Sequence, residues 1–246
     1  MNESKGVSIC ISAWKAQEYI EECLDSIYSQ SWFKNHNEWE VLIGIDGCVD
    51  TLKKMNEIKH KYKNLRVFMM SSNKGTYVTC NTIIKLSRYE WVMRFDSDDI
   101  MRENCIETMM NECDNFDLLI GDVINFGMET RVTNQIKKGV GQQFIRKSVF
   151  LELNGYDNYR ISMDSDLINK IKKFYRFKHI QKVLANRRQH ENSLTCSKDT
   201  CTNILKDCGL SQKRKEVYSI IKNPARYYTK ECIKNKNFVT NTYTEV

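Results

Sequence analysis

The sequence contains no long apolar segment, no C-x-x-C pair and no glycine in the stretch that follows its first apolar run. No apolar run approaches the roughly 18 residues that cross a bilayer, and the polar residues 1–5 do not resemble a secretory signal. The ten cysteines are scattered singly, so we expect buried free thiols in a reducing compartment rather than a disulfide framework. These absences predict a cytoplasmic protein that is soluble or, at most, attached to a membrane surface.

The composition is that of a globular protein with a basic surface. With 41% hydrophobic and 28% charged residues, the 246-residue chain can form a sizeable core, which excludes general disorder. The length suits one large domain, or one domain with a tail. The net charge of +7 indicates a surface that accepts anionic partners such as nucleotides, nucleic acid or acidic lipid. Charge alone does not distinguish among these partners.

Short apolar runs alternate with amphipathic stretches through the first hundred residues. Strands are predicted at 7–11, 40–45, 65–70 and 91–95, and helices at 17–30, 51–61 and 78–87. This alternation predicts an α/β fold with a parallel sheet that helices cover on both faces. Ligands bind at the carboxyl ends of the strands in such sheets, and three strands here lead into Ser12, Asp46 and Asp96. The sequence therefore predicts a site at this edge of the sheet.

The second half of the chain has a less regular pattern. A strand is predicted at 116–121, a polar loop at 132–141, and helices at 144–153 and 165–174. From Cys196 onward the chain is basic, with helical periodicity and no turn-rich linker. We therefore predict a catalytic domain at 1–195 and a basic, helical C-terminal extension at 196–246.

Three carboxylates follow the predicted strand at 91–95 within four residues, namely Asp96, Asp98 and Asp99. Charges so close repel one another unless a cation neutralises them, and hard oxygen ligands suit Mg²⁺ or Mn²⁺. A metal held by one or two carboxylates leaves positions open for a diphosphate. The alternative is a solvated acidic turn that caps a following helix. The position at the end of a central strand makes the metal site as well supported as the capping turn, and these residues alone leave both open.

Six further segments accompany this acidic cluster in a fixed order. They are the opening 7–14 with 18–27, WEVLIGIDGCVD at 39–50, Asn73-Lys74-Gly75 with Asn81, residues 144–147 with 154–157, Met163-Asp164-Ser165-Asp166-Leu167, and His190 with Ser193 and Thr195. In this order and spacing the chain resembles a family 2 glycosyltransferase of the GT-A type over roughly residues 7–195. The resemblance implies a Rossmann-like, mostly parallel sheet flanked by helices. It also implies an inverting enzyme that uses a nucleoside diphosphate sugar, with a UDP-sugar as the expected donor.

The resemblance also implies roles for the donor-binding residues. Asp46 would accept a hydrogen bond from the base or the ribose, Ser12 and Trp14 would line the same pocket, and Asp96 would approach the ribose. Trp14 offers a flat face to a base, although packing against the sheet edge would equally explain it.

Four other residues would bind the metal or take part in the reaction. Asp98 would be the first metal ligand, and Asp99 either a second ligand through water or a helix cap. His190 would reach the metal or the diphosphate. Asp164 would act as general base towards the acceptor hydroxyl, while the metal stabilises the departing diphosphate. We expect Asp166 to cap the helix that follows it.

The chain departs from the family pattern at three positions. Ile45 replaces an acid next to Asp46, and Met163 replaces the acid before Asp164. Cys80 replaces an arginine, for which Lys74, Arg94 or the pair Arg187–Arg188 would have to substitute. These changes predict an unusual donor or acceptor rather than loss of activity.

Two other function classes remain open on the residues alone. A metal-dependent nucleotidyltransferase would also use a carboxylate cluster, but residues 12–17 lack the glycine-rich phosphate loop expected of it. A non-catalytic adaptor would bind through the basic tail, which contains interspersed aromatic residues and could contact an anionic membrane. We expect a glycan, lipid-linked or protein hydroxyl acceptor, possible peripheral membrane contact through the tail, and no nucleic-acid partner.

Overall fold

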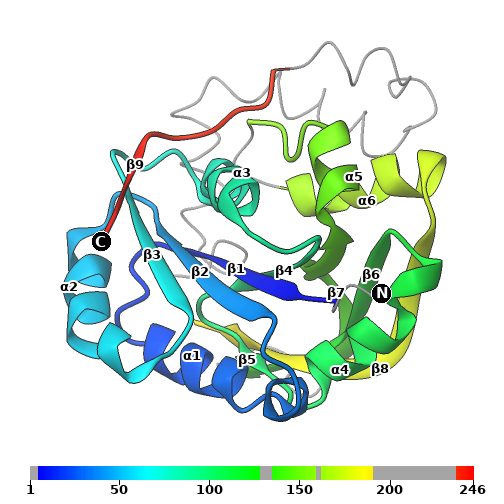
Figure 1. Cartoon of the computed structure of the whole chain (residues 1–246), viewed down its shortest axis with the longest axis horizontal. Coiled ribbons are helices and arrows are strands. Elements are labelled where there is room, and N and C mark those ends of the chain that lie inside the picture. The colour runs from blue at the N-terminus through cyan, green and yellow to red at the C-terminus, as the bar shows by residue number, and fades with distance from the viewer. Residues whose placement is uncertain (1–4, 128–134, 159–161, 191–236) are drawn as a thin grey trace.

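The computed structural model describes residues 5–127, 135–158, 162–190 and 237–246. In these residues a nine-stranded sheet has the strand order β5-β8-β6-β7-β4-β1-β2-β3-β9 (Figure 1). The strands are β1 (Val7–Ala13), β2 (Trp39–Ile45), β3 (Leu65–Met70), β4 (Trp91–Asp96), β5 (Ile100–Met101), β6 (Leu118–Gly127), β7 (Ile136–Arg146), β8 (Phe177–Gln189) and β9 (Tyr243–Glu245). The α-helices are α1 (Ile20–Tyr28), α2 (Val49–Ile58), α3 (Thr76–Leu86), α4 (Cys105–Glu112), α5 (Lys147–Glu152) and α6 (Met163–Phe174).

The first half of the chain forms the parallel part of the sheet, as predicted. Strands β4, β1, β2 and β3 lie side by side and parallel, joined by α1, α2 and α3. The register places Ser12 beside both Gly44 of β2 and Asp96 of β4. The carboxyl ends of these strands therefore meet at one edge, where the sequence predicts the site.

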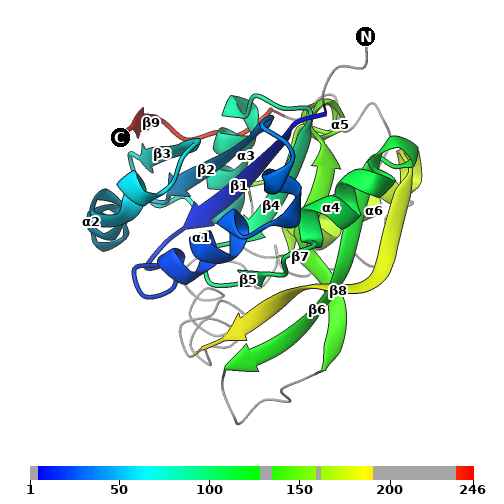
Figure 2. The same ribbon diagram turned by 60° about the horizontal axis from the view of Figure 1, so that its bottom comes forward.

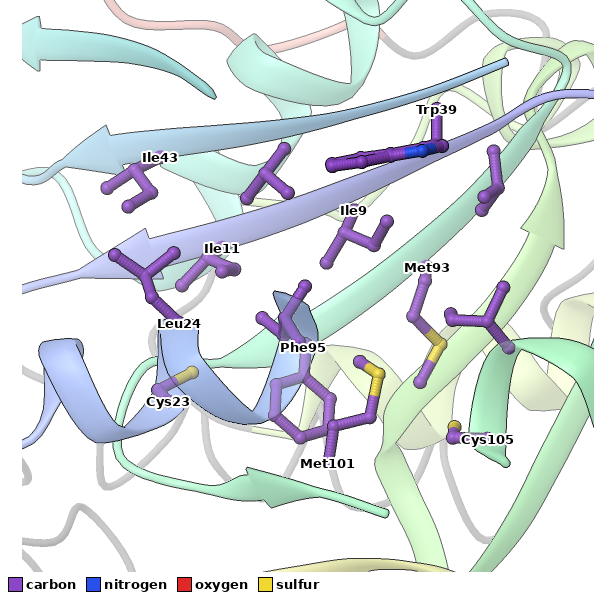
Figure 3. Close-up of a cluster of buried hydrophobic side chains, with 14 of the residues drawn as sticks. Ile9, Ile11, Cys23, Leu24, Trp39, Ile43, Met93, Phe95, Met101 and Cys105 are labelled. Carbon is purple, nitrogen blue, oxygen red and sulfur yellow. The ribbon is translucent and has the colours of Figure 1, made fainter. Parts of the chain in front are cut away.

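Helices cover both faces of the sheet, which confirms the predicted α/β arrangement. Helices α1, α2 and α4 lie on one face, and α3, α5 and α6 lie on the other (Figures 1 and 2). Figure 3 shows the hydrophobic core between the sheet and the layer of α1, α2 and α4. In this core Ile9, Ile11 and Phe95 of the sheet face Cys23 and Leu24 of α1. Burying each large side chain contributes about 1.5–3 kcal/mol, so both layers are held firmly to the sheet.

The second half of the chain adds antiparallel strands next to β4. Strand β7 pairs antiparallel with β4 and with β6, and β6 runs parallel to β8 (Figure 2). The predicted loop at 132–141 is wrong from Ile136 onward, because this stretch begins β7, and the predicted helix at 144–153 starts three residues later, at Lys147. The sequence of β7 shows no apolar alternation, because some of its buried side chains are polar. Gln142 and Gln143 are buried and hydrogen-bonded to residues of other elements. Helix α4 and strand β8 were not predicted.

The last ten residues form no helix, and three of them, strand β9, belong to the sheet. Residues 196–236 of the predicted extension, including most of its basic side chains, lie outside the described residues. Residues 237–246 contradict the helical prediction, because β9 pairs antiparallel with β3, with Glu245 opposite Phe68 and Tyr243 opposite Met70. The edge strand β3 offers unpaired backbone groups that an extended segment satisfies and a helix cannot. Within the described part of the chain, no helix is both long and apolar enough to cross a membrane.

Candidate active site

Asp96 ends β4 and forms an ion pair with Arg94 on the same face of that strand. Arg94 Nη2 lies 2.6 Å from Asp96 Oδ1, and Nη1 lies 3.1 Å from Oδ2, a bidentate arrangement. Nη1 of the buried arginine also donates to the carbonyl of Gly141 in β7. Burial raises the pKa of Asp96 to about 6; Arg94 opposes this shift, and the charges of Asp98 and Asp164 add to it. The Asp96 carboxylate is therefore held in a region of concentrated negative charge.

The base predicted from the resemblance, Asp164, lies close to Asp96. Asp164 is the second residue of α6, and its Oδ1 accepts a hydrogen bond of 2.7 Å from the amide of Ser165. A Cβ atom on Gly141 would lie 3.1 Å from Asp96 Oδ2 and 3.9 Å from Asp164 Oδ2. Both carboxylates therefore lie beside the backbone of Gly141, which carries no side chain. The sequence did not indicate Gly141, because a single glycine in a polar stretch carries no recognisable signal.

Asp98 and His190 also come together, although 92 positions separate them in the sequence. His190 Nε2 lies 2.9 Å from Asp98 Oδ2, and both side chains are partly exposed. The imidazole ring packs against Tyr19 of the stretch leading into α1, with ring centroids 4.8 Å apart. Asp98 follows β4 and His190 follows β8, so it is the packing of the two halves of the sheet that creates this pair.

Asp98 and His190 fit part of a divalent metal site. They supply one carboxylate and one imidazole, donors that Mn²⁺ accepts, whereas Mg²⁺ prefers oxygen alone. Among the described residues, no group of three or more His, Cys, Asp or Glu side chains could hold a metal ion. The pair would therefore supply two ligands of such a site.

Asp99 is buried and tied to the antiparallel part of the sheet. Its Oδ1 accepts a hydrogen bond of 2.8 Å from the amide of Arg188, and its Oδ2 accepts one from the side chain of Gln142. Burial, together with the charges of Asp96 and Asp98, raises the pKa of Asp99 well above its ordinary value. The helix-capping alternative is wrong, because the short strand β5 follows Asp99 directly and α4 begins only at Cys105.

Asp46 organises the loop that leads into α3. Its buried carboxylate accepts hydrogen bonds from the amides of Lys74 (2.9 Å) and Gly75 (2.8 Å) and from Thr79 Oγ1 (3.0 Å). Trp14, one residue beyond β1, is 48% exposed, with the Lys15 ammonium 4.7 Å from its ring centre. Ser12, Trp14 and Asp46 thus lie at the ends of the neighbouring strands β1 and β2, as predicted.

Several charged residues have structural roles that the sequence did not reveal. Asp166 is the fourth residue of α6 rather than its cap, and Lys170 Nζ lies 2.7 Å from its Oδ2; the capping prediction is therefore wrong. Among the cations considered for the phosphate site, Arg94 is bound to Asp96. Arg188 donates to the carbonyl of Asp98 and pairs with Glu22.

Comparisons with known proteins identify the family of the chain. The family model described as "Glycosyl transferase family 2" matches residues 8–171, about two thirds of the chain. A chondroitin synthase of Escherichia coli is 27% identical over 211 residues, which is 78% of this chain and 30% of that protein. The poly(ribitol-phosphate) beta-N-acetylglucosaminyltransferase TarP of Staphylococcus aureus is 32% identical over 129 residues, 51% of this chain and 38% of that protein. The chain thus spans less than two fifths of the length of these two relatives.

A solved structure with the same fold is TarS 1–349 of S. aureus in complex with UDP-GlcNAc. It superposes with a TM-score of 0.65 at 18% identity, and the match covers 76% of this chain and 60% of that one. This likeness confirms the GT-A type of fold predicted from the sequence.

Proposed function

The chain belongs to glycosyl transferase family 2, and from this membership and the site geometry we propose that it transfers a sugar from a nucleoside diphosphate sugar to a hydroxyl acceptor. The observation that carries the proposal is that β4, β7 and α6 come together at one edge of the sheet. Asp96 and Asp98 come from the end of β4, and Asp164 comes from the first turn of α6, next to the bare backbone of Gly141. Sugar transfer needs both kinds of group: carboxylates beside the donor diphosphate, and a separate carboxylate beside the acceptor hydroxyl.

We propose that the donor is a UDP-sugar. The nucleoside would lie over the ends of β1 and β2, with its base against the exposed face of Trp14 and its polar edge towards Ser12 and Asp46. Three of the acceptor positions of the Asp46 carboxylate are already used within the protein. Asp46 would therefore have two roles in base recognition: it would hold the loop at 73–75, and it would accept a hydrogen bond from the ligand. The solved relative in complex with UDP-GlcNAc supports this choice of donor.

The chemistry that we propose is a single displacement with inversion at the anomeric carbon. Asp164 would accept the proton of the acceptor hydroxyl as that oxygen attacks the sugar. Asp96 would approach the ribose, held in place by Arg94. Asp98 and His190, and Asp99 through water, would hold a divalent cation, which when bound stabilises the charge on the leaving diphosphate. The partial exposure of both side chains of the Asp98–His190 pair supports this assignment.

The names of the relatives support a polymer as acceptor. One relative is named a chondroitin synthase and another a poly(ribitol-phosphate) beta-N-acetylglucosaminyltransferase, and both names contain a polymer with hydroxyl groups. We therefore propose that the acceptor is a hydroxyl of a glycan or of a polyol-phosphate chain.

A thermal-shift screen tests the proposed donor class. The purified chain is heated with UDP, GDP, CDP, and the corresponding sugar nucleotides, each with and without Mn²⁺. A ligand present at 100 times its Kd stabilises the folded state by about 2.7 kcal/mol, which raises the melting temperature by several degrees. We expect UDP and one UDP-sugar to give the largest shifts, and only with Mn²⁺. Absence of a shift with every nucleotide would refute the proposed donor class.

A further inference from the structure

A buried hydrogen-bond network connects α3 to the first turn of α6. We infer that this network, formed by Asn81, Tyr156 and Gln143, positions Asp164 for catalysis; the inference rests on the proposed role of Asp164 as general base. None of the three side chains touches the reacting atoms in this scheme. They are positioning residues.

The network begins on the donor side of the site. Asn81 of α3 is fully buried, and its side-chain amide binds the backbone of Tyr156 twice. Asn81 Nδ2 donates to the Tyr156 carbonyl (2.8 Å), and the Tyr156 amide donates to Asn81 Oδ1 (2.9 Å). Gly155 permits this close approach, since its φ is +62° and a Cβ there would lie 2.5 Å from Asn81 Oδ1. The turn before α6 is therefore fixed to the helix whose N-terminal loop Asp46 holds.

The network ends on the backbone of Asp164. The Tyr156 hydroxyl, which is buried, donates to Gln143 Oε1 over 2.6 Å. The other end of that amide, Gln143 Nε2, donates to the main-chain carbonyl of Asp164 over 2.9 Å. Gln143 lies in β7, directly opposite Arg94 of β4, so the same strand that carries Gly141 also holds the base. The carbonyl of Asp164 is thereby fixed relative to the Arg94–Asp96 pair.

The chemical requirement explains why these polar groups are buried. A general base must lie within hydrogen-bond distance of the proton that it accepts, and a misplacement of about 1 Å can cost about 100-fold in rate. Asp164 lies at a helix start that is preceded by Ser162 in the left-handed conformation, with φ of +63°. The first N–H groups of a helix have no partner within the helix, so its first turn is held by fewer bonds than its interior, and the added bond from Gln143 to the Asp164 carbonyl restricts the position of that turn. Tyr156 and Gln143 supply that restriction.

Three variants and a matched control test the inference. Tyr156→Phe removes only the hydroxyl, Gln143→Met removes the amide at similar volume, and the third variant combines both. The control is Tyr62→Phe, which removes the partly buried hydroxyl of another tyrosine that donates to Asp25 over 2.7 Å; neither Tyr62 nor Asp25 belongs to the network. The assay is Mn²⁺-dependent release of UDP, with water as acceptor, from the UDP-sugar that gives the largest thermal shift. Melting temperatures are measured for every variant.

We expect Tyr156→Phe and Gln143→Met each to lower kcat about tenfold while the KM for the donor changes less than about twofold. The double variant should be no more than about twofold slower than the slower single variant, because both bonds act in series. Tyr62→Phe should lose a similar amount of melting temperature and keep its kcat.

Two contrary results are distinguishable. If Tyr156→Phe and Gln143→Met lose melting temperature as Tyr62→Phe does but keep kcat, the network is merely structural and the inference is wrong. If one of the two variants does not fold, the other alone decides. Asp164→Asn is measured in parallel: full activity in that variant refutes the proposed base itself, whatever the network variants do. An inactive Asp164→Asn beside a fully active Tyr156→Phe overturns only the positioning inference.

Discussion

Replacing Asp46 with Ala is expected to destabilise the folded state even when no nucleotide is present. The carboxylate is 2% exposed and accepts three hydrogen bonds, from two backbone amides and one hydroxyl. Hydrogen bonds to a charged group contribute at least about 1.5 kcal/mol each. The amides of Lys74 and Gly75 are partly buried and can recover some of this loss by binding water. We therefore expect the free energy of unfolding to fall by about 3–4 kcal/mol.

The Asn variant at the same position makes the prediction more specific. In Asp46, Oδ1 accepts from Lys74 and Thr79, and Oδ2 accepts from Gly75. The amide oxygen of Asn can replace Oδ1, but its NH₂ group would face the Gly75 N–H and lose that one bond. We therefore expect Asp46→Asn to cost about 1–2 kcal/mol, which is less than the effect of Ala.

Equilibrium unfolding in urea, followed by far-UV circular dichroism, measures both values. Asp50→Asn is the control, because Asp50 is exposed in the first turn of α2 and should cost less than about 1 kcal/mol. The reasoning is refuted if Asp46→Ala lies within about 1 kcal/mol of the wild type, or if Asn is as damaging as Ala.

Four further outcomes are expected. Asp98→Ala should abolish the Mn²⁺-dependent part of the thermal shift with UDP, and a shift equal to that of the wild type would remove Asp98 from the metal site. Asp164→Asn should keep the donor-induced thermal shift yet lose at least about 100-fold in the rate of transfer, measured by UDP release; unchanged release would move the base elsewhere. Gly155→Ala should cost about 1–3 kcal/mol in urea unfolding because of its positive φ and its contact with Asn81; an unaffected variant would show that the turn relaxes easily. Removing residues 237–246 should lower the melting temperature by about 2–4 °C per kcal/mol lost, because edge strand β3 loses its partner β9; an unchanged melting temperature would mean that β9 contributes nothing to stability.

The sequence by itself determined the parallel half of the fold and the sheet edge at which the candidate site residues lie. Four short apolar runs and the helices between them were predicted within a few residues of β1–β4 and α1–α3. These elements are encoded locally, since a buried strand is a short apolar run and a covering helix has a 3.6-residue apolar period. Once the strands are parallel, their carboxyl ends must share an edge. The placement of Ser12, Asp46 and Asp96 at that edge therefore required no knowledge of the tertiary structure.

Only the tertiary structure decided what the polar side chains contact. Gln143 lies in a stretch without apolar alternation, yet it is buried because Tyr156 and the Asp164 backbone satisfy its amide. Residues 237–246 read as part of a helix, yet β9 forms because the open edge of β3 provides backbone partners. A polar group is buried only where a partner from elsewhere in the chain can bond it. Because those partners lie tens to hundreds of positions away, no local pattern reveals them, and folding alone brings them together.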